Sequence, residues 1–101
     1  MRMPRKVVIG KTTYTIGRNR SRADAGSFDA SGKPNIRVST AFPAGNIPAT
    51  LIHEILHAGQ WEYAVPLNEK GLDLMAHIFI DLVRHNPKLV AYLSEAKGDK
   101  A

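Results

Sequence analysis

The pattern of apolar residues changes once along this chain, near residue 46, and this change limits the fold class. Before it, β-branched residues occur in short runs that are separated by glycine and polar residues. After it, apolar residues recur every three or four positions, which is the period of an amphipathic helix. Strands followed by helices predict an α+β fold. A chain of 101 residues has room for one modest core, so we expect a single domain over residues 1–101.

The first strands are predicted to form an antiparallel hairpin. Residues 6–9 and 12–16 are the arms, and Gly10 takes the first position of a type II′ turn. This register places Val7 opposite Tyr14 and gives the sheet one apolar face.

The segment that follows the hairpin contains two weaker strand signals. Residues 17–35 are rich in turn-forming residues and are expected to form a connection, interrupted by a short strand near residues 26–28. Residues 36–39 alternate between apolar and polar, which predicts a further strand. In that strand, Arg37 and Ser39 are expected to face outward.

The C-terminal half predicts three helices. The first begins near Pro48 and runs to about Trp61. Asn68 can cap the second helix, with Glu69 in its first turn, and the break at residues 86–87 ends that helix and begins the third. The second helix has an apolar stripe that is expected to face the core: Leu72, Met75, Ala76, Phe79, Leu82 and Val83.

The first predicted helix contains the sequence HExxH, formed by His53, Glu54 and His57. Two histidines four residues apart lie on one helix face, so that both imidazoles can bind one metal ion. Glu54 lies about 100° around the helix from His53 and can reach a water on that metal without being a ligand. This pattern predicts a zinc site with Glu54 as its catalytic base.

A hydrolytic zinc site has three protein ligands, so a third ligand is needed. We expect it to be Glu69, which opens the second helix twelve residues after His57. Asp73, one turn later, could accept a hydrogen bond from the outer nitrogen of His53 or His57 and so orient that ligand.

Two other residues, Glu62 and His77, remain as alternatives in this site. Glu62 could be the third ligand only if the first helix ended immediately after Trp61. His77 lies on the same helix face as Glu69 and could be a ligand or a hydrogen-bond donor to the reacting oxyanion. His85 is most simply a cation at a helix C-terminus.

The segment from Thr50 to Ala58, with its HExxH, resembles the zincin metallopeptidases. Residues 68–73 (Asn-Glu-Lys-Gly-Leu-Asp) are similar to the NExxxD pattern of the thermolysin-like, or gluzincin, branch. Together with residues 86–87 (Asn-Pro), the arrangement is especially similar to small metallopeptidase-like proteins of phages and prophages. The distance from His57 to Glu69 is shorter than in the large thermolysin-like enzymes.

The resemblance implies a zinc-dependent peptidase whose substrate is a peptide or a protein. Zinc activates a water and polarises the carbonyl, and Glu54 takes the proton of the water and delivers it to the leaving amine. The substrate is expected to pair with the strand at residues 36–39, as zincin substrates pair with an edge strand. The candidate donors to the oxyanion are Tyr63, His77, His85 and Arg37.

Composition and charge leave two other kinds of function open. Residues 1–52 carry nine Lys or Arg and two Asp, which also fits a basic accessory protein that associates with nucleic acid. The third possibility is a catalytically idle domain that keeps zinc for stability. The absence of cysteine excludes a disulfide scaffold, a thiolate nucleophile and a Cys-based zinc finger. No signal peptide or membrane span is recognisable, so a cytoplasmic location without membrane contact is expected.

Overall fold

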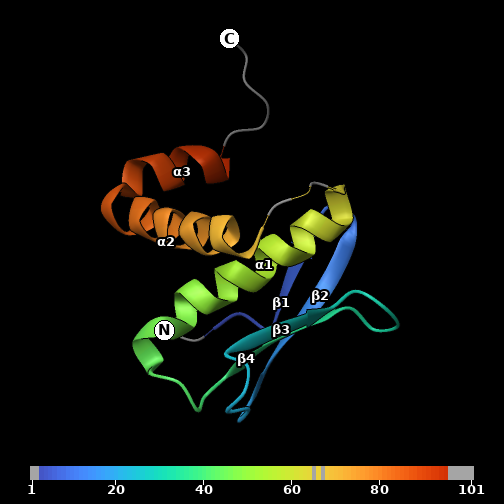
Figure 1. Cartoon of the computed structure of the whole chain (residues 1–101). Helices are drawn as coiled ribbons and strands as arrows, with labels where there is room; N and C mark the ends of the chain where they lie inside the picture. The colour runs from blue at the N-terminus through green and yellow to red at the C-terminus, as the bar shows by residue number, and fades with distance from the viewer. Residues whose placement is uncertain (1–2, 65, 67, 96–101) are drawn as a thin grey trace.

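The computed structural model describes residues 3–64, 66 and 68–95, and it confirms the α+β fold. A four-stranded sheet is followed by three helices (Figure 1). The elements are β1 (Lys6–Ile9), β2 (Thr12–Asn19), β3 (Gly26–Asp29), β4 (Asn35–Ser39), a 3₁₀ turn (Ala44–Asn46), α1 (Ile47–Tyr63), α2 (Glu69–His85) and α3 (Pro87–Glu95).

The predicted hairpin is confirmed, including its register. Val7 pairs with Tyr14, and Gly10 has a φ of 62° while the next residue does not have a positive φ, as a type II′ turn requires. The second strand is longer than expected and continues to Asn19. Residues 17–19, predicted as connection, are held in β2 because they pair with residues 37–39 of β4.

The sheet has the order β1-β2-β4-β3, and β2 and β4 run parallel to each other. The expectation that residues 36–39 offer an edge to a substrate is therefore wrong, because β4 pairs with β2 on one side and with β3 on the other. Ser39 was also wrongly expected to face outward. It is buried, and its hydroxyl donates a hydrogen bond to the carbonyl of Ser21 over 2.5 Å. Within the described part of the chain, β3 pairs only with β4, so its other edge is free.

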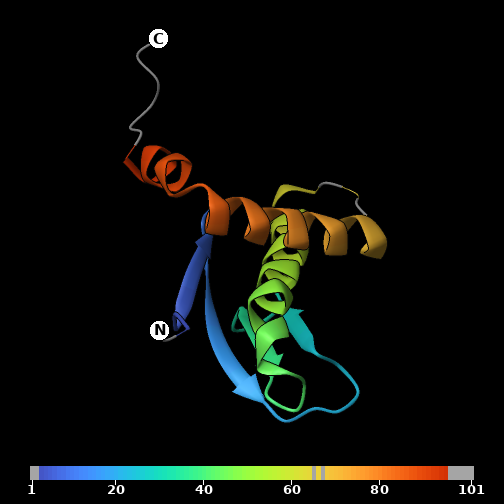
Figure 2. The ribbon, with the colours of Figure 1, turned by 90° about the vertical axis from the view of Figure 1, so that its left-hand side faces the viewer.

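The helices form two further layers on one face of this sheet. Helix α1 covers the sheet, and α2 crosses α1 on the side away from the strands (Figures 1 and 2). The core lies between the sheet and α1, and burial of each large apolar side chain there contributes about 1.5–3 kcal/mol. Its buried residues are Ile9, Tyr14, Ile16, Ile36 and Ala58.

A polar contact joins the last turns of α1 to the hairpin. The carboxylate of Glu62 accepts one hydrogen bond from the hydroxyl of Thr12 and another from that of Tyr14, each 2.7 Å long. These bonds hold the pKa of Glu62 below its usual range. Burial, followed by the bond to Glu62, raises the pKa of Tyr14 to about 12. This contact fixes how α1 lies across the strands.

The apolar stripe of α2 is only partly buried. Leu72 and Ala76 are fully buried, as expected. The prediction is wrong for the other four residues of the stripe, because the contact between α1 and α2 leaves their side chains partly exposed. Those residues are Met75, Phe79, Leu82 and Val83, with exposed fractions of 39–49%. Among the described residues, no helix combines the length and the apolar character that crossing a membrane requires.

Candidate metal centre

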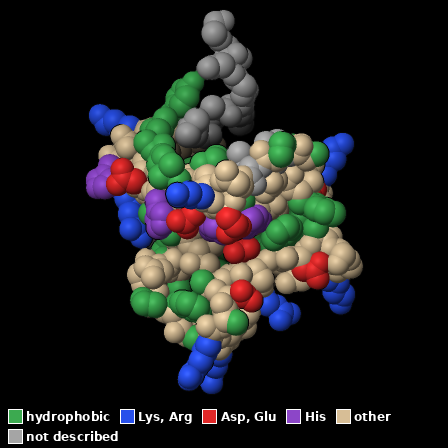
Figure 3. Space-filling model, viewed as in Figure 1, with side chains coloured by type: hydrophobic (Ala, Val, Ile, Leu, Met, Phe, Trp, Pro, Cys, Tyr) green, Lys and Arg blue, Asp and Glu red, His purple; other side chains and the backbone are tan. Residues whose placement is uncertain are grey.

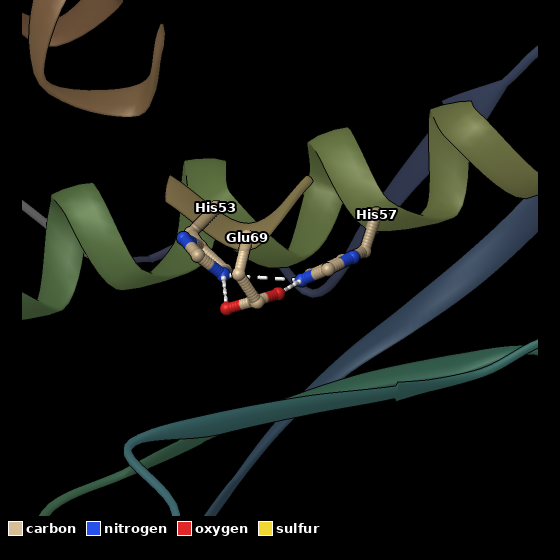
Figure 4. Close-up of side chains that lie close together, drawn as sticks. All are labelled: His53, His57 and Glu69. Atoms are coloured by element: carbon tan, nitrogen blue, oxygen red, sulfur yellow. Dashed lines mark hydrogen bonds and ion pairs between the residues drawn. The ribbon is translucent and has the colours of Figure 1, made fainter. Parts of the chain in front are cut away.

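The two histidines of HExxH project from neighbouring turns of α1 toward the same point. The Nε2 atoms of His53 and His57 are 3.1 Å apart, and their ring centroids are 4.8 Å apart with the ring planes at 65° (Figure 4). The side chains are 14% and 22% exposed, so both rings are partly withdrawn from water. The i, i+4 spacing on one helix produces this convergence.

Glu69 completes the cluster from the first turn of α2. The side chain of Asn68 caps this helix by accepting a hydrogen bond of 2.7 Å from the backbone N–H of Gly71, which fixes where α2 begins. One carboxylate oxygen of Glu69 is 3.1 Å from Nε2 of His53, and the other contacts Nε2 of His57. Figure 4 shows the carboxylate lying between the two rings.

The chemistry of these three side chains fits a divalent metal ion. One ligand atom from each of His53, His57 and Glu69 lies within 4.8 Å of the others. Two nitrogens bound to one tetrahedral zinc at 2.0–2.1 Å would be roughly 3.3 Å apart, close to the 3.1 Å observed. Three protein ligands leave one coordination position open, which is typical of catalytic rather than structural zinc sites.

Glu54 is not part of this cluster and lies toward the sheet edge. It is 8% exposed, and a Cβ atom placed on Gly26 of β3 would lie 3.0 Å from its Oε2. Burial raises the pKa of Glu54, whereas His57 and His53 act in the opposite direction, and Glu69 adds to the increase. A carboxylate held in this way beside the histidines is available to accept a proton.

Asp73 lies one turn beyond Glu69 on α2 and faces the outer side of the first histidine. Its Oδ1 is 3.6 Å from Nδ1 of His53, and its Oδ2 is 3.6 Å from Nε2 of His77. Both distances are slightly longer than a hydrogen bond and are short enough for an electrostatic interaction. Asp73 thus occupies the position expected of a carboxylate that orients His53, and His77 lies outside the ligand cluster.

A cleft of about 570 Å³ opens beside the cluster. It lies between the start of β3 and the N-terminal halves of α1 and α2, and we call it the acidic cleft. Figure 3 shows acidic side chains and histidines in a row across this face of the molecule. The titratable residues of its wall are Asp24, His53, Glu54, Glu69, Asp73 and His77.

No family model, curated protein or solved structure matches this chain.

The remaining candidates from the sequence lie elsewhere. Glu62 is engaged with the hairpin and is absent from the ligand cluster. His85 is at the end of α2, where its Nδ1 lies 3.1 Å from Asp81 and 3.0 Å from the backbone oxygen of the same residue. Tyr63 lies near the hairpin turn, and Arg37 is exposed on β4 between two buried residues. Of the four candidate oxyanion donors, only His77 lines the acidic cleft.

The contribution of β3 to the site was not predicted from the sequence. Gly26 packs against Glu54, and the ring of Phe28 stacks on His57 with centroids 5.8 Å apart and planes at 8°. Asp24, just before this strand, lines the acidic cleft. These residues belong to no recognisable motif. The one available signal was a glycine at the start of a predicted strand, since such glycines often mark a close backbone approach.

Proposed function

We propose that this chain is a zinc-dependent metallopeptidase, in which His53, His57 and Glu69 hold the zinc ion and Glu54 is the general base and acid. The observation that carries the proposal is the buried Glu54 carboxylate beside three convergent ligands. A structural zinc site needs no such carboxylate and usually has four protein ligands. The resemblance of HExxH and of residues 68–73 to gluzincins supports the same activity.

Each residue of the site has a separate role in the proposed hydrolysis. A zinc ion held by His53, His57 and Glu69 would polarise the scissile carbonyl and activate a water molecule. Glu54 removes a proton from water, the oxygen adds to the carbonyl carbon, and Glu54 returns the proton to the leaving nitrogen as the C–N bond breaks. We assign His77 as the hydrogen-bond donor to the developing oxyanion, because His77 lines the acidic cleft together with Glu54.

The free edge of β3 is the proposed docking position for the peptide backbone. The sequence had suggested residues 36–39 for this role, but their strand, β4, is paired on both sides. An extended peptide can add to such an edge through main-chain hydrogen bonds, which bring its carbonyls to a fixed distance from the neighbouring helix. Gly26 places this edge against Glu54.

The first experiment measures bound metal and hydrolysis of an unfolded protein substrate in parallel. We expect about one zinc per chain in the wild type and in Glu54→Gln, and much less in Glu69→Ala. Hydrolysis should fall by at least about 100-fold in Glu54→Gln, because the proton acceptor is lost while the ligands remain. Asp81→Asn removes an exposed carboxylate of α2 outside the site and is the matched control.

The other outcomes point to the two alternative functions. Stoichiometric zinc without hydrolysis in the wild type would indicate a domain that keeps zinc for stability. A wild-type protein that binds no zinc after reconstitution would contradict the peptidase function. Salt-dependent binding of DNA would then favour an accessory role for the basic N-terminal half.

A further inference from the structure

The candidate metal centre separates two hollows of different chemical character. His53 lies in the wall of the acidic cleft, and His57 lies in the wall of a second hollow of about 590 Å³. The second wall includes Phe28, Trp61 and Pro66, and we call it the apolar hollow. Since the two histidines are one helical turn apart, a peptide bond held at the centre has one hollow on each side.

The acidic cleft has a local negative charge that the chain as a whole does not have. The net charge of the chain is +5, yet among the described residues four carboxylates and no Lys or Arg line this cleft. Glu54 and Glu69 together balance the charge of a divalent ion, so Asp24 and Asp73 remain as the excess negative charge. A cationic side chain is the group that complements such a wall.

The apolar hollow offers aromatic surface next to the other histidine. Trp61 is 67% exposed, and Phe28 is half-buried and stacks on the ring of His57. Figure 3 shows hydrophobic side chains gathered at one end of the row of acidic groups. Covering an exposed tryptophan with an apolar side chain removes much nonpolar surface from water, and such residues often dominate binding energy.

The direction of strand β3 determines in which direction a peptide paired with it runs. Its first residue, Gly26, lies at the acidic cleft beside Glu54, and Phe28 lies at the apolar hollow beside His57. The strand therefore runs from the acidic cleft toward the apolar hollow. A peptide that pairs with it antiparallel, the slightly more stable arrangement, runs from the apolar hollow to the acidic cleft.

We propose that the substrate has an aromatic or branched apolar residue on the N-terminal side of the cleaved bond and Lys or Arg on the C-terminal side. This inference rests on the peptidase function proposed above. The reaction is the same hydrolysis, with the new carboxylate on the apolar fragment and the new amine on the cationic fragment.

The test is peptide binding to zinc-loaded Glu54→Gln, measured by fluorescence anisotropy so that no cleavage is needed. The probe is an eight-residue peptide with phenylalanine and lysine flanking its central bond. The comparison peptides replace the lysine with glutamate or exchange the phenylalanine with the lysine. We expect the probe to bind about tenfold more tightly than either, because only the probe places a cation beside the carboxylates and a ring in the apolar hollow.

Two further variants assign this preference to the two hollows. Asp24→Asn should reduce the preference for lysine over glutamate by about threefold, the effect of one exposed charge. Trp61→Ala should weaken binding of all phenylalanine peptides about fivefold without changing the preference for lysine. The matched controls are Asp81→Asn and Val8→Ala, which alter an exposed acid and an exposed apolar residue outside both hollows.

Equal binding of the lysine and glutamate peptides, tighter binding of the exchanged peptide, or no binding by any of the three would overturn this inference. None of these results bears on the peptidase function itself, which is tested by zinc content and by hydrolysis of an unfolded protein. If the wild type cleaves that protein, mass spectrometry of the fragments gives a second readout. Cleavage sites without enrichment of an apolar residue before the bond and a basic residue after it would overturn the substrate preference alone.

Discussion

Gly26 lies so close to Glu54 that a Cβ atom at Gly26 would be 2.8 Å from Cγ of the glutamate. The same atom would be 2.8 Å from the methyl group of Thr50, so the position is closed by α1. Strand β3 can approach α1 to this distance only because the residue has no side chain. The contact therefore sets the separation between the free sheet edge and the proposed catalytic base.

Gly26→Ala should lower the free energy of unfolding by about 1–3 kcal/mol, because the side chains of Thr50 and Glu54, or the elements that carry them, must move to admit the methyl group. Hydrolysis should fall with it, while zinc stoichiometry is kept, since the ligands come from α1 and α2. Chemical denaturation and metal analysis check both effects. Gly17→Ala is the control, because no atom of the described residues lies within 4 Å of its added Cβ, and its stability should change by less than about 0.5 kcal/mol. Similar behaviour of the two variants would contradict the role of Gly26.

Removal of metal should destabilise the wild type and leave it folded. At free zinc 100 times above its dissociation constant, binding adds about 2.7 kcal/mol, which corresponds to roughly 10–20 °C in melting temperature. The core between the sheet and α1 contains none of the ligands, so the far-ultraviolet circular dichroism of the metal-free protein should stay close to that of the folded form. Thermal melts with and without chelator measure this difference. Glu69→Ala should melt at the same temperature in both conditions, and a chelator effect of equal size in that variant would exclude Glu69 as a ligand.

Substitutions of Asp73 and of His77 should have different effects: the first on zinc affinity and the second on the rate of hydrolysis. Asp73→Asn removes the charge 3.6 Å from Nδ1 of His53 and should weaken zinc affinity about tenfold, as loss of a supporting carboxylate does. His77→Asn should leave zinc affinity unchanged and lower the rate of hydrolysis at full zinc occupancy by about 10-fold or more, because it is assigned to the oxyanion. Competition with a zinc-binding dye measures affinity. A loss of zinc in His77→Asn would make this residue a ligand instead.

The pair formed by Tyr14 and Glu62 should make stability depend on pH at both extremes. Tyr14 has a pKa of about 12 in the folded protein against an ordinary value of 10.0, so the folded state keeps its proton more tightly than the unfolded state. Its contribution is complete below pH 10 and is lost as the pH rises toward 12. Glu62 has a lowered pKa, so its contribution is present above its usual pKa and is lost as the pH falls through the lowered one.

Tyr14→Phe tests the alkaline part of this dependence. The variant should be about 1 kcal/mol less stable than the wild type at neutral pH, because one hydrogen bond is lost, and the difference should shrink between pH 10 and 12. Urea denaturation at several pH values gives the two curves. Tyr63→Phe, at an exposed tyrosine, is the control and should follow the wild type throughout. A difference between Tyr14→Phe and wild type that stays constant up to pH 12 would contradict the raised pKa.

The features that depend on short spacings could be predicted from the sequence. The hairpin register follows from two strands around one glycine, and the cap at Asn68 follows from the residue types at the start of a helix. The convergence of His53 and His57 follows from the helical repeat alone. Glu69 required one further assumption, that the second helix crosses the first, and the apolar periods of both helices made that crossing reasonable.

The features that depend on pairing between distant segments could not be predicted. Nothing local distinguishes a parallel from an antiparallel partner for β2, so the insertion of β4 beside it and the exclusion of β3 to the edge were missed. The substrate edge was assigned to the wrong strand for this reason. The spacing of apolar residues likewise indicates that α2 has an apolar face, but it does not indicate how much of that face another element covers.

The uneven burial of α2 predicts an uneven response to truncation of its apolar side chains. Leu72 is fully buried at the crossing with α1, and Leu72→Ala should cost about 2–5 kcal/mol in free energy of unfolding because it leaves a cavity. Phe79 is 49% exposed beyond the crossing, so Phe79→Ala should cost less than about 1 kcal/mol despite the larger side chain that it removes. Chemical denaturation at low protein concentration compares the two. If Phe79→Ala cost as much as Leu72→Ala, the exposed part of the stripe would have to be covered in solution, and the loss should then depend on protein concentration if a second copy of the chain covers it.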